Sequence, residues 1–589
     1  MQRQRRGGLG PPFLFSGFRI DPRRTRIYHQ AVQPVISAQQ MREIDLLTVQ
    51  NHQIPSLQLM DSAAAACLQA IAAEFGGDLA GKRIQILCGP GNNGGDGAAL
   101  ARQLNNLDVQ VDLVLFGRLA ETSDDAHCNL EALWQLAVEN EQNNRAGNLS
   151  FIECNDVTRW ESIANNERSY DVVFDALFGT GLKRPLSGVF AEVVKHLSSV
   201  KLKETTSDRP IIVSVDLPSG LDADQAQPIG PAVAADLTVT FTAPKVANVL
   251  PPASHLNGKL VIADIGSPTT LVNAAASKTF LTAERDARNW LINTRYQPDS
   301  FKNTHGHVLV LAGSRGYTGA AVLSANAAMR SGAGLVTVGT PASSQNAVAT
   351  AVMAEVMTTA LAETDRGAIS DHAVDHVIGL MTKVNAVAIG PGISATDERT
   401  RRFVQLVVEQ RKTVVVIDAD ALNCLSPWPN NLRGSDEAQL ILTPHPGEMM
   451  RLLGTTDKSL LNDRVAVARE FAARHKLILV LKGSRSLIAA PDGRVFINPT
   501  GNAGLGTAGA GDTLTGIIAG FVAQAAATLR ENADPLAATI AALYIGGLAG
   551  DFAARRLGMR AMVASDIREH LSDAIRSLDP QGEQPNFPQ

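Results

Sequence analysis

The stretch GLGTAGAGDTLTG, residues 504–516, carries the strongest indication of fold and chemistry in this chain. Its small residues let the backbone approach an anion closely, and the apolar run 517–522 that follows is typical of a helix whose N-terminus faces that anion. Asp512 would lie at the start of this helix, where a carboxylate can take a proton from a hydroxyl during phosphoryl transfer. A glycine-rich turn that Asp512 merely caps is the alternative. The stretch therefore predicts a phosphate-handling loop that leads into a helix.

Upstream of this stretch, short β-branched runs alternate with helical patterns. Residues 36–75 carry apolar residues at helical spacing, and the later runs are expected to be buried strands. Alternation of this kind implies mostly parallel sheets with helices on both faces, so we predict an α/β fold in two domains. The expected strands are 84–88, 109–116, 172–176, 211–215, 237–241 and 260–262 in the first domain, and 308–311, 335–338, 386–389, 414–417, 439–442, 477–481 and 486–490 in the second.

Breaks in this rhythm divide the chain into segments. We expect an arginine-rich tail over 1–34, a first domain over 35–267, a linker over 268–280, a second domain over 281–578 and a short tail over 579–589. The first thirty residues hold seven arginines and one acid, Asp21. A transit peptide, a disordered tail and an upstream start codon without functional meaning remain open for this segment.

Composition argues against several classes of protein. The formal net charge is -5, and no window shows the basic stripe of a nucleic-acid binder. No apolar run approaches the roughly 20 residues needed to cross a bilayer. The five cysteines are scattered, with no close pair for zinc or redox chemistry, which favours a reducing cytosol. We therefore expect a cytoplasmic enzyme that acts on small molecules as a homo-oligomer, without nucleic-acid or membrane partners.

In the first domain, polar residues follow three expected strands. The string GPGNNGGDG, residues 89–97, contains a GxGxxG pattern but lacks the usual acid after the next strand, so an ordinary dinucleotide fingerprint is doubtful. Asp175 and Asp216 follow two further strands, and with Asn93 and Ser219 they are expected to converge on one crevice. Such hard oxygen ligands suit an alkali or alkaline-earth cation. For each acid alone, capping of a helix is the alternative.

NNGGDG, FDALFGTGLKR and VDLPSGLDAD, in this order, resemble the NAD(P)H-hydrate epimerase family over residues 35–265. This resemblance implies a Rossmann-like domain that interconverts the C6 epimers of hydrated NADH and NADPH. It implies a potassium ion bound by Asn93, Asp175 and Ser219, and a role for Asp216 in labilising and returning the C6 oxygen, with Lys183 supporting charge nearby. The implied substrate-binding residues are Asn92, Asn93, Gly94, Gly95, Asp96, Gly179, Thr180, Gly181, Leu182, Lys183, Arg184, Pro185 and Asp216.

In the second domain, the motifs AGSRGYTGAA, IGPG, DADALN, TPHPGE and LKGSRS precede the opening stretch, each after an expected strand. Cationic and hydroxyl side chains of LKGSRS could meet the phosphate of a nucleotide. Asp418 and Asp420 are as well explained by helix capping as by contact with a ligand. His445, between two prolines, is as well explained by a structural role.

With the opening stretch, these motifs resemble the ADP-dependent NAD(P)H-hydrate dehydratases over residues 281–571, whose fold is similar to that of ribokinase-like kinases. The resemblance implies Ala320, Gly392, His445 and Asp512 at the hydrated nucleotide. It implies Lys482, Gly483, Ser484, Arg485, Ser486 and Gly511 at ADP, the phosphate donor, with Mg²⁺. The chain departs from the family pattern at residues 502–506 and at Arg485, which bears on loop rigidity and on the choice of phosphate donor.

Together the resemblances imply one bifunctional repair enzyme, in which the first domain converts the epimer that the second cannot use. Asp512 would be the base and Asp216 a catalytic residue. Two alternatives remain at this stage: a ribokinase-like small-molecule kinase with a regulatory first domain, and a first domain that only binds partners. Stable phosphorylated product would favour the kinase.

Overall fold

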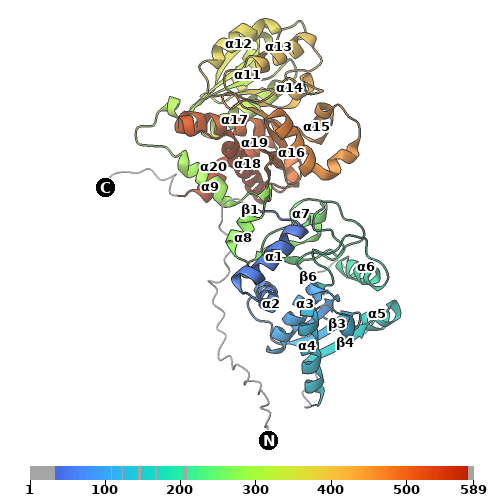
Figure 1. Cartoon of the computed structure of the whole chain (residues 1–589). Helices are drawn as coiled ribbons and strands as arrows, with labels where there is room; N and C mark the ends of the chain where they lie inside the picture. The colour runs from blue at the N-terminus through green and yellow to red at the C-terminus, as the bar shows by residue number, and fades with distance from the viewer. Residues whose placement is uncertain are drawn as a thin grey trace.

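The computed structural model of the chain describes residues 33–580, apart from 108, 123, 143–147, 166–168 and 203–208. Residues 1–32 of the expected tail and the residues after 580 therefore lie outside the described residues, whereas residues 33 and 34, also assigned to that tail, form a strand of the second domain's sheet. Two α/β domains lie one above the other in Figure 1, the first domain below and the second above. The prediction of two α/β domains with mostly parallel sheets is confirmed, because the chain forms one sheet of seven strands and one of eleven.

The first domain is a seven-stranded sheet in which every pair of neighbours is parallel. Strand order runs β4-β3-β2-β5-β6-β7-β8, so the direction of winding reverses between β2 and β5. Ligands bind at such a switch point, beyond the carboxyl ends of the strands. The strands are β2 (Arg83–Cys88), β3 (Gln110–Phe116), β4 (Leu149–Cys154), β5 (Val172–Ala176), β6 (Ile211–Val215), β7 (Leu237–Phe241) and β8 (Lys259–Ala263).

The helical pattern over 36–75 forms two helices, α1 (Ala38–His52) and α2 (Ser56–Glu74), where the sequence predicted one continuous stretch. Gln53 ends α1 in the left-handed region, and Pro55 stands immediately before α2, a position where its ring cannot disturb an earlier turn. Ser37 caps α1 in a capping box with Gln40. The remaining helices of the domain are α3 (Asn92–Asn105), α4 (Asp124–Gln142), α5 (Val157–Ala164), α6 (Val189–Lys201) and α7 (Val246–Val249).

The second domain has an eleven-stranded sheet ordered β1-β9-β18-β17-β16-β15-β14-β13-β10-β11-β12. The strands from β12 to β16 are parallel, and β17 is antiparallel to both of its neighbours. Its strands are β1 (Gln33–Pro34), β9 (Thr279–Leu281), β10 (His307–Leu311), β11 (Leu335–Pro341), β12 (Met357–Leu361), β13 (Ala386–Ile389), β14 (Val414–Ile417), β15 (Leu440–Leu442), β16 (Ile478–Leu481), β17 (Leu487–Ala489) and β18 (Val495–Ile497).

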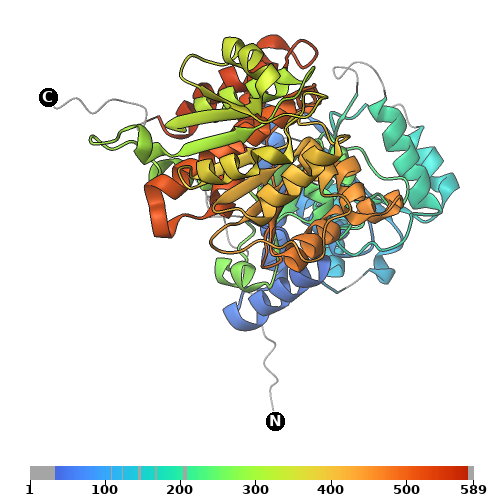
Figure 2. The same cartoon turned by 90° about the horizontal axis from the view of Figure 1, so that it is seen from above.

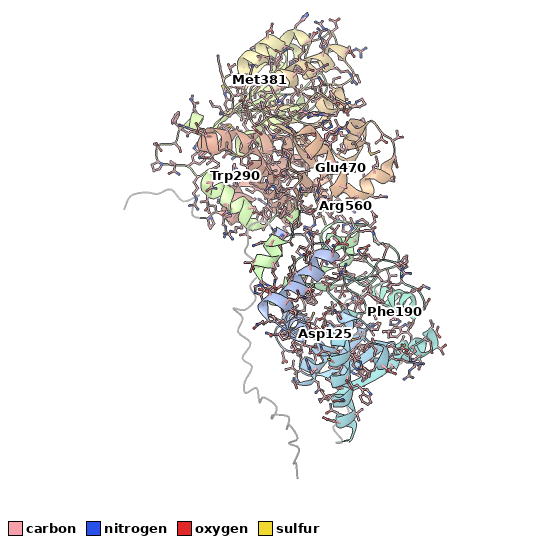
Figure 3. The ribbon with its side chains drawn as sticks, viewed as in Figure 1. Asp125, Phe190, Trp290, Met381, Glu470 and Arg560 are labelled. Atoms are coloured by element: carbon pink, nitrogen blue, oxygen red, sulfur yellow. The ribbon has the colours of Figure 1, made fainter. Side chains whose placement is uncertain are left out.

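Helices cover both faces of this sheet, as the view from above shows (Figure 2). Alternate residues of β10 point to opposite faces of the sheet and pack in two separate hydrophobic cores. Val308 and Val310 belong to the first core, and Leu309 and Leu311 belong to the second. In the first core Trp290, labelled in Figure 3, stacks on Phe521 with ring centroids 4.2 Å apart. The helices are α9 (Glu284–Asn293), α10 (Thr318–Arg330), α11 (Gln345–Ala351), α12 (Val374–Met381), α13 (Glu398–Glu409), α14 (Ala419–Cys424), α15 (Pro446–Leu453), α16 (Arg464–His475), α17 (Ala510–Leu529), α18 (Pro535–Leu557), α19 (Ala564–Glu569) and α20 (Leu571–Leu578).

Two helical segments, Ala510–Asn532 and Pro535–Leu557, are long and apolar enough to cross a membrane by length and composition. The expectation that no apolar run approaches this length is therefore wrong. The most apolar windows of the two segments are 67% and 72% buried inside the protein. In this domain α17 and α18 are core helices, and their apolar character follows from being enclosed on most sides.

The chain ahead of α1 joins the two domains. β1 pairs antiparallel with β9 at the edge of the second sheet, and Val35 continues the pairing by donating its N–H to Thr279. Ile36 then donates to the carbonyl of Pro244 in the first domain. The expected linker 268–280 contains a helix, α8 (Thr269–Ala274), whose Val272 packs with Met41 and Ile44 of α1. Residues on both sides of the first domain thus fasten it to the second.

Candidate functional site

In the first domain, NNGGDG forms the first turns of α3, which begins directly after the loop that follows β2. A Cβ on Gly94 would overlap the carbonyl of Gly89, and one on Gly97 would lie 2.7 Å from the Cys88 sulfur. These glycines allow the helix to pack closely against the strand it follows. The N-terminus of α3 therefore lies directly beyond the carboxyl end of β2, next to the switch point of the sheet.

Asp175 is the last residue but one of β5 and is fully buried. Ser219 donates to it twice, from its hydroxyl at 2.6 Å and its amide at 2.9 Å, and Ser214 donates its hydroxyl at 2.8 Å. Burial raises the pKa of this carboxyl against the lowering effect of these bonds. Asp175 caps no helix, so the capping alternative is wrong for this acid. The predicted pairing of Asp175 with Ser219 is present.

Asp216 follows β6 with its backbone in the left-handed region, at φ 65°. Its Oδ1 accepts from the ammonium of Lys245 at 2.6 Å and from the hydroxyl of Thr240 at 3.0 Å. Its Oδ2 faces Gly179, where a Cβ would lie 3.1 Å from it and 3.0 Å from the side-chain oxygen of Asn93. A left-handed aspartate is costly and persists where the surroundings impose it, as at functional sites. Asn93, Gly179 and Asp216 thus converge as expected.

Lys245, which sequence reasoning did not single out, is 1% exposed and is the cation paired with Asp216. Its ammonium also donates to Thr240 at 2.9 Å and to the carbonyl of Phe241 at 3.2 Å. Lys183, expected to support charge near Asp216, instead bonds Asp222 at 2.6 Å and Asp224 at 2.8 Å. The sequence signal for Lys245 is a lysine surrounded by apolar residues shortly after a buried strand.

Two further carboxyl groups belong to this cluster. Burial raises the pKa of Asp45 on α1 to about 6, with Lys245 opposing the rise and Asp216 adding to it. Burial, with the charges of Asp216 and Asp45, raises the pKa of Asp96 on α3 well above its ordinary value. One Asp45 oxygen and the Asn93 side-chain nitrogen are buried with no hydrogen-bond partner among the described residues. Acids with raised pKa values beside a buried lysine are typical of a site that moves protons.

In the second domain, Asp512 lies in the first turn of α17, after Gly509 at φ 84°. No side chain caps this helix, so the alternative of a turn capped by Asp512 is wrong. The Asp512 carbonyl accepts from the hydroxyl of Ser324, which also bonds the carbonyl of Ala320 and thus ties α10 to the start of α17. Burial and the charge of Asp418 raise the pKa of Asp512 to about 6, while Lys482 opposes the rise.

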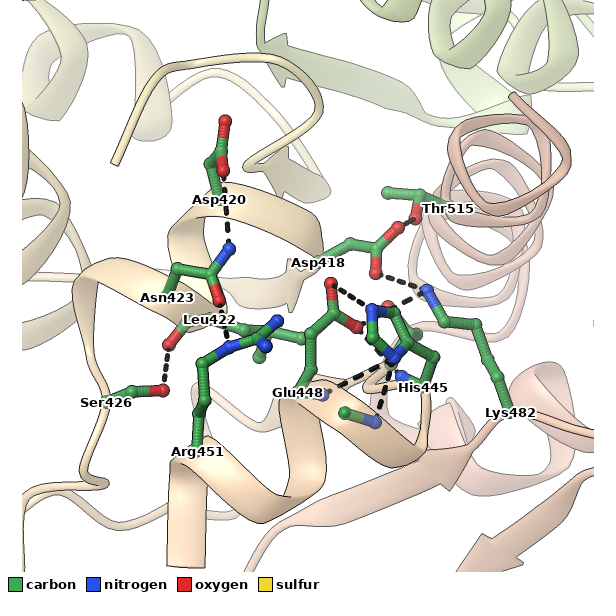
Figure 4. Close-up of polar contacts among 12 residues, drawn as sticks. Asp418, Asp420, Leu422, Asn423, Ser426, His445, Glu448, Arg451, Lys482 and Thr515 are labelled. Atoms are coloured by element: carbon green, nitrogen blue, oxygen red, sulfur yellow. Dashed lines mark hydrogen bonds and ion pairs between the residues drawn. The ribbon is translucent and has the colours of Figure 1, made fainter. Parts of the chain in front are cut away.

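Asp418, Lys482 and Thr515 form a buried polar network beside Asp512 (Figure 4). Asp418 accepts from the Lys482 ammonium at 2.7 Å and from the Thr515 hydroxyl at 2.7 Å. It is the N-cap residue of α14, but its side chain makes no capping bond, so the capping alternative for Asp418 is wrong. A Cβ on Gly511 would lie 3.3 Å from the Lys482 ammonium. Burial alone would lower the pKa of Lys482, but Asp418 and Glu448 hold it above its ordinary value.

His445 begins α15, and its Nδ1 accepts from the amides of Gly447 at 3.0 Å and Glu448 at 3.4 Å. The structural role considered for His445 is therefore real. Because Nδ1 accepts, the neutral ring carries its proton on Nε2, which lies 3.5 Å from Glu448. Burial and the charges of Lys482 and Arg451 lower the pKa of His445, and its side chain is half exposed. A neutral histidine with a donating Nε2 remains able to contact a ligand.

Ala320 and Gly392 lie side by side at the ends of neighbouring strand-to-helix connections. A Cβ on Gly392, at φ 62°, would lie 3.1 Å from the Ala320 methyl and 2.8 Å from Cβ of Tyr317. The Ser314 hydroxyl bonds the Gly392 carbonyl at 2.9 Å and holds this arrangement. Ala320 thus contacts Gly392 and is tied through Ser324 to Asp512, while the joint role of these residues with His445 at the hydrated nucleotide stays a prediction.

The segment 482–486 directly follows β16. Arg485, at φ 55°, donates to the carbonyl of Pro499 at 2.7 Å, and burial lowers its pKa. Arg464 supports the same turn through the carbonyl of Ser484 at 3.0 Å. Leu505, in the divergent stretch 502–506, packs against α18 where a Cβ on Gly550 would lie 2.6 Å from it. Both departures from the family pattern are thus structural contacts of the loop itself.

An open cavity of about 810 Å³ adjoins this site on the His445 side. It is lined by Tyr317, Asp420, Asn423, Arg401 and Arg451, among others, and not by Asp512. Asp420, offered above as a possible cap, accepts from the amide of Ser394 at 3.0 Å and the amide group of Asn423 at 3.3 Å. The cavity therefore extends the site away from Lys482.

Comparison with known proteins connects both sites with one chemistry. A family model described as NAD(P)H-hydrate dehydratase matches residues 308–573, and one described as YjeF-related protein N-terminus matches residues 56–247. The bifunctional NAD(P)H-hydrate repair enzyme Nnr of Moorella thermoacetica is 39% identical over 93% of this chain and 98% of its own length. The enzyme of the same name from Escherichia coli is 32% identical over 82% of this chain and 83% of its own.

Solved structures are similar to the second domain. An ADP/ATP-dependent NAD(P)H-hydrate dehydratase from Bacillus subtilis, co-crystallised with ATP and Mg²⁺, is 30% identical with a TM-score of 0.43, covering 50% of this chain and 98% of that one. A ribokinase-like superfamily protein from Enterococcus faecalis is 25% identical with a TM-score of 0.43, covering 51% of this chain and 96% of that one.

Proposed function

Because this chain belongs to the family of bifunctional NAD(P)H-hydrate repair enzymes, with an epimerase half and an ADP-dependent dehydratase half, we propose that the two charged clusters are its two active sites. The first domain epimerises hydrated NADH and NADPH, and the second dehydrates them to the reduced cofactors. The kinase alternative is not favoured, since both halves match repair enzymes. One observation supports the second site most: Asp512 lies in the first turn of α17, beside the pair formed by Asp418 and Lys482.

Dehydration begins with activation of the C6 hydroxyl. Its oxygen attacks the terminal phosphorus of ADP, the bond from that phosphorus to the bridging oxygen breaks, and AMP leaves. Asp512 accepts the hydroxyl proton, a role suited to a carboxylate whose pKa of about 6 lies near neutral pH. The amides of residues 509–512 stabilise the charge on the transferring phosphoryl group.

The phosphorylated intermediate then eliminates. The C6–O bond breaks with phosphate as leaving group, a proton leaves C5, and the double bond of the reduced nicotinamide ring is restored. Ala320, Gly392 and His445 bind the hydrated ring, with the Nε2 proton of His445 directed to an acceptor on the substrate. Their adjoining placement supports this role.

Lys482 and the turn 483–486, with Gly511, bind the adenine nucleotide. The proximity of the Lys482 ammonium to Gly511 supports this assignment. Mg²⁺ would accompany the nucleotide, because it is usually bound by one or two carboxylates and substrate phosphates. Glu448, beside Lys482, is a carboxyl group that could hold that ion, since Asp512 serves as the base.

In the first domain, Asp216 is the group that acts at C6, and Lys245 orients it. The ammonium of Lys245 holds Oδ1, which leaves Oδ2 toward Gly179 and Asn93, where the ring would bind. Asn92 to Asp96 and the loop from Gly179 to Pro185 surround that position. Loss and return of the C6 oxygen beside Asp216 inverts the carbon. Lys245 is a positioning residue in this proposal.

A potassium ion fits the residues Asn93, Asp175 and Ser219, all of which offer oxygen. None of the described residues forms an ion pair with the buried carboxylate of Asp175, so a monovalent cation would supply its missing counter-charge. The ion would hold the loops after β5 and β6 together and fix the loop that leads from Phe178 into residues 179–185.

We further propose that the protein is a cytoplasmic homo-oligomer.

The test uses hydrated NADH of mixed C6 epimers with ADP. Wild type should clear both epimers, with release of AMP and phosphate and recovery of reduced-nicotinamide absorbance. Asp512→Asn should clear neither, and Asp216→Asn should clear one quickly and leave the other. A stable phosphorylated product from the wild type would refute the dehydratase assignment, and full-speed epimerisation by Asp216→Asn would refute the role of Asp216.

A further inference from the structure

The cavity of about 810 Å³ beside the second active site is not used by the chemistry described above. Its lining includes two arginines, Arg401 and Arg451, and one acid, Asp420. Two cations against one carboxylate leave a net positive lining. Both oxygens of Asp420 already accept from Ser394 and Asn423. The cavity is therefore suited to an anionic ligand, and its volume lies in the range of sites for cofactor-sized molecules.

Arg451 lies nearer to the reacting centre. It belongs to α15, the helix that His445 begins, and a Cβ on Gly447 would lie 3.8 Å from its Nη1. Asn423 fixes this arginine by accepting from its Nε at 2.8 Å. The contact leaves the terminal nitrogens of the guanidinium able to meet an anion in the fork geometry that suits phosphate.

Arg401 lies beyond Arg451 on α13, across α14. Its Nη1 reaches the carbonyl of Asn423 at 3.5 Å, so Asn423 stands between the two arginines. The charge of Arg401 acts on the Cys424 thiol, whereas that of Arg451 acts on His445. From the active site outward, the order is therefore Gly392 and His445, then Arg451, then Arg401.

This order matches the order of groups in a hydrated nicotinamide dinucleotide: the ring, the pyrophosphate and the adenosine ribose. We propose that the cavity binds the adenosine half of the dinucleotide, with Arg451 at the pyrophosphate and Arg401 at the 2′-phosphate that distinguishes NADPH hydrate from NADH hydrate. The inference rests on the proposed dehydratase function. Tyr317, 63% exposed at the cavity and adjoining Gly392, offers a ring near the junction of the two halves.

Steady-state kinetics with purified S epimers provide the test. Arg401→Gln should raise KM for NADPH hydrate about tenfold and that for NADH hydrate less than twofold, as expected for the loss of one charge-assisted contact to phosphate. Arg451→Gln should raise both KM values about tenfold. Neither change should alter KM for ADP or kcat. Arg402→Gln is the matched control, because Arg402 neighbours Arg401 on α13, is 71% exposed and does not line the cavity.

A binding experiment separates this inference from the function itself. Adenosine 2′,5′-bisphosphate is titrated calorimetrically into the full chain at saturating ADP. Wild type and Arg402→Gln should bind it, and Arg401→Gln at least about tenfold more weakly. Competition between the bisphosphate and ADP, a rise in KM for ADP, or equal effects of Arg401→Gln on both hydrates would overturn the assignment. Wild type that binds the bisphosphate yet dehydrates no hydrate would refute the proposed function and leave the cavity assignment standing.

Discussion

Replacing Asp512 by asparagine is expected to abolish dehydration and, at neutral pH, to stabilise the second domain. The rise in the pKa of Asp512 from 3.8 to about 6 corresponds to about 3 kcal/mol of differential interaction between the two protonation states. A carboxyl group with a raised folded-state pKa contributes its full stability below its unfolded pKa, and this contribution is lost as pH rises through about 6. At pH 7.5 the ionised carboxylate therefore lowers the free energy of unfolding.

Asp512 is partly exposed, so solvent screening reduces the effect to about 1–2 kcal/mol. We expect Asp512→Asn to raise the free energy of unfolding by that amount at pH 7.5 and by almost nothing at pH 4. Hydrogen exchange of the buried amides of α17 measures this, because it reports on the second domain alone if the two domains unfold separately.

Asp492→Asn is the matched control, since Asp492 is an exposed carboxylate of the same domain and keeps its bond from the Arg494 amide. Its stability should follow that of the wild type at both pH values. A variant Asp512→Asn that is less stable than wild type at pH 7.5, or whose advantage does not shrink at pH 4, would refute the reasoning that burial and Asp418 disfavour the ionised form. Retained dehydration would refute the role of Asp512 as base.

Three other changes test the remaining interactions. Wild-type kcat/KM for dehydration should rise with pH through about 6, as Asp512 loses its proton. Asp418→Asn should move this rise to lower pH, because it removes the charge that raises the pKa of Asp512 and frees Lys482 to lower that pKa. A rise that moves to higher pH would contradict this. Lys245→Met should slow epimerisation at least about tenfold by leaving Asp216 without its buried partner, while dehydration of the pure S epimer stays unchanged. Lys195→Met, at an exposed lysine, is the control. Normal epimerisation by Lys245→Met would exclude the positioning role. Gly516→Ala should destabilise the second domain by more than about 3 kcal/mol, since its Cβ would overlap the Ser324 carbonyl. Gly379→Ala is the control, because Gly379 is exposed within α12 with nothing near its Cβ, and this variant should be neutral or stabilising by up to about 1 kcal/mol. Equal melting temperatures for the two variants would show that α10 and α17 can move apart.

Sequence alone predicted the central strands well, because they are buried on both faces and consist of unbroken apolar runs. The bounds of β5, β6, β7, β13 and β14 are those expected. The edge strands β1, β4 and β12 were missed, and so were β9 and β18, which follow β1 in the strand order. β12 is only partly buried, and β1 and β9 are two and three residues long. None of these three strands therefore shows the continuous apolar pattern of a central strand.

The strand ends also predicted most of the acidic and glycine positions of the two sites, since polar residues directly after buried strands must converge at one edge of a parallel sheet. Lys245 and Asp45 could not be found in this way. Asp45 comes from α1, far from any strand end, and Lys245 lies four residues beyond β7. Their contribution depends on how α1 packs over the sheet, which sequence periodicity does not determine.

The pairing of β1 with β9 has a consequence for how the protein is made. β1 leaves the ribosome before either domain, but its partner is synthesised only after the whole of the first domain. The second sheet therefore completes its edge with a segment that is made before either domain, and a second domain made on its own would leave the backbone of β9 open to other chains. Because the two activities share one polypeptide, β1 is available to cover the edge of the second sheet at β9. Cleavage between the domains should therefore favour aggregation of the dehydratase half.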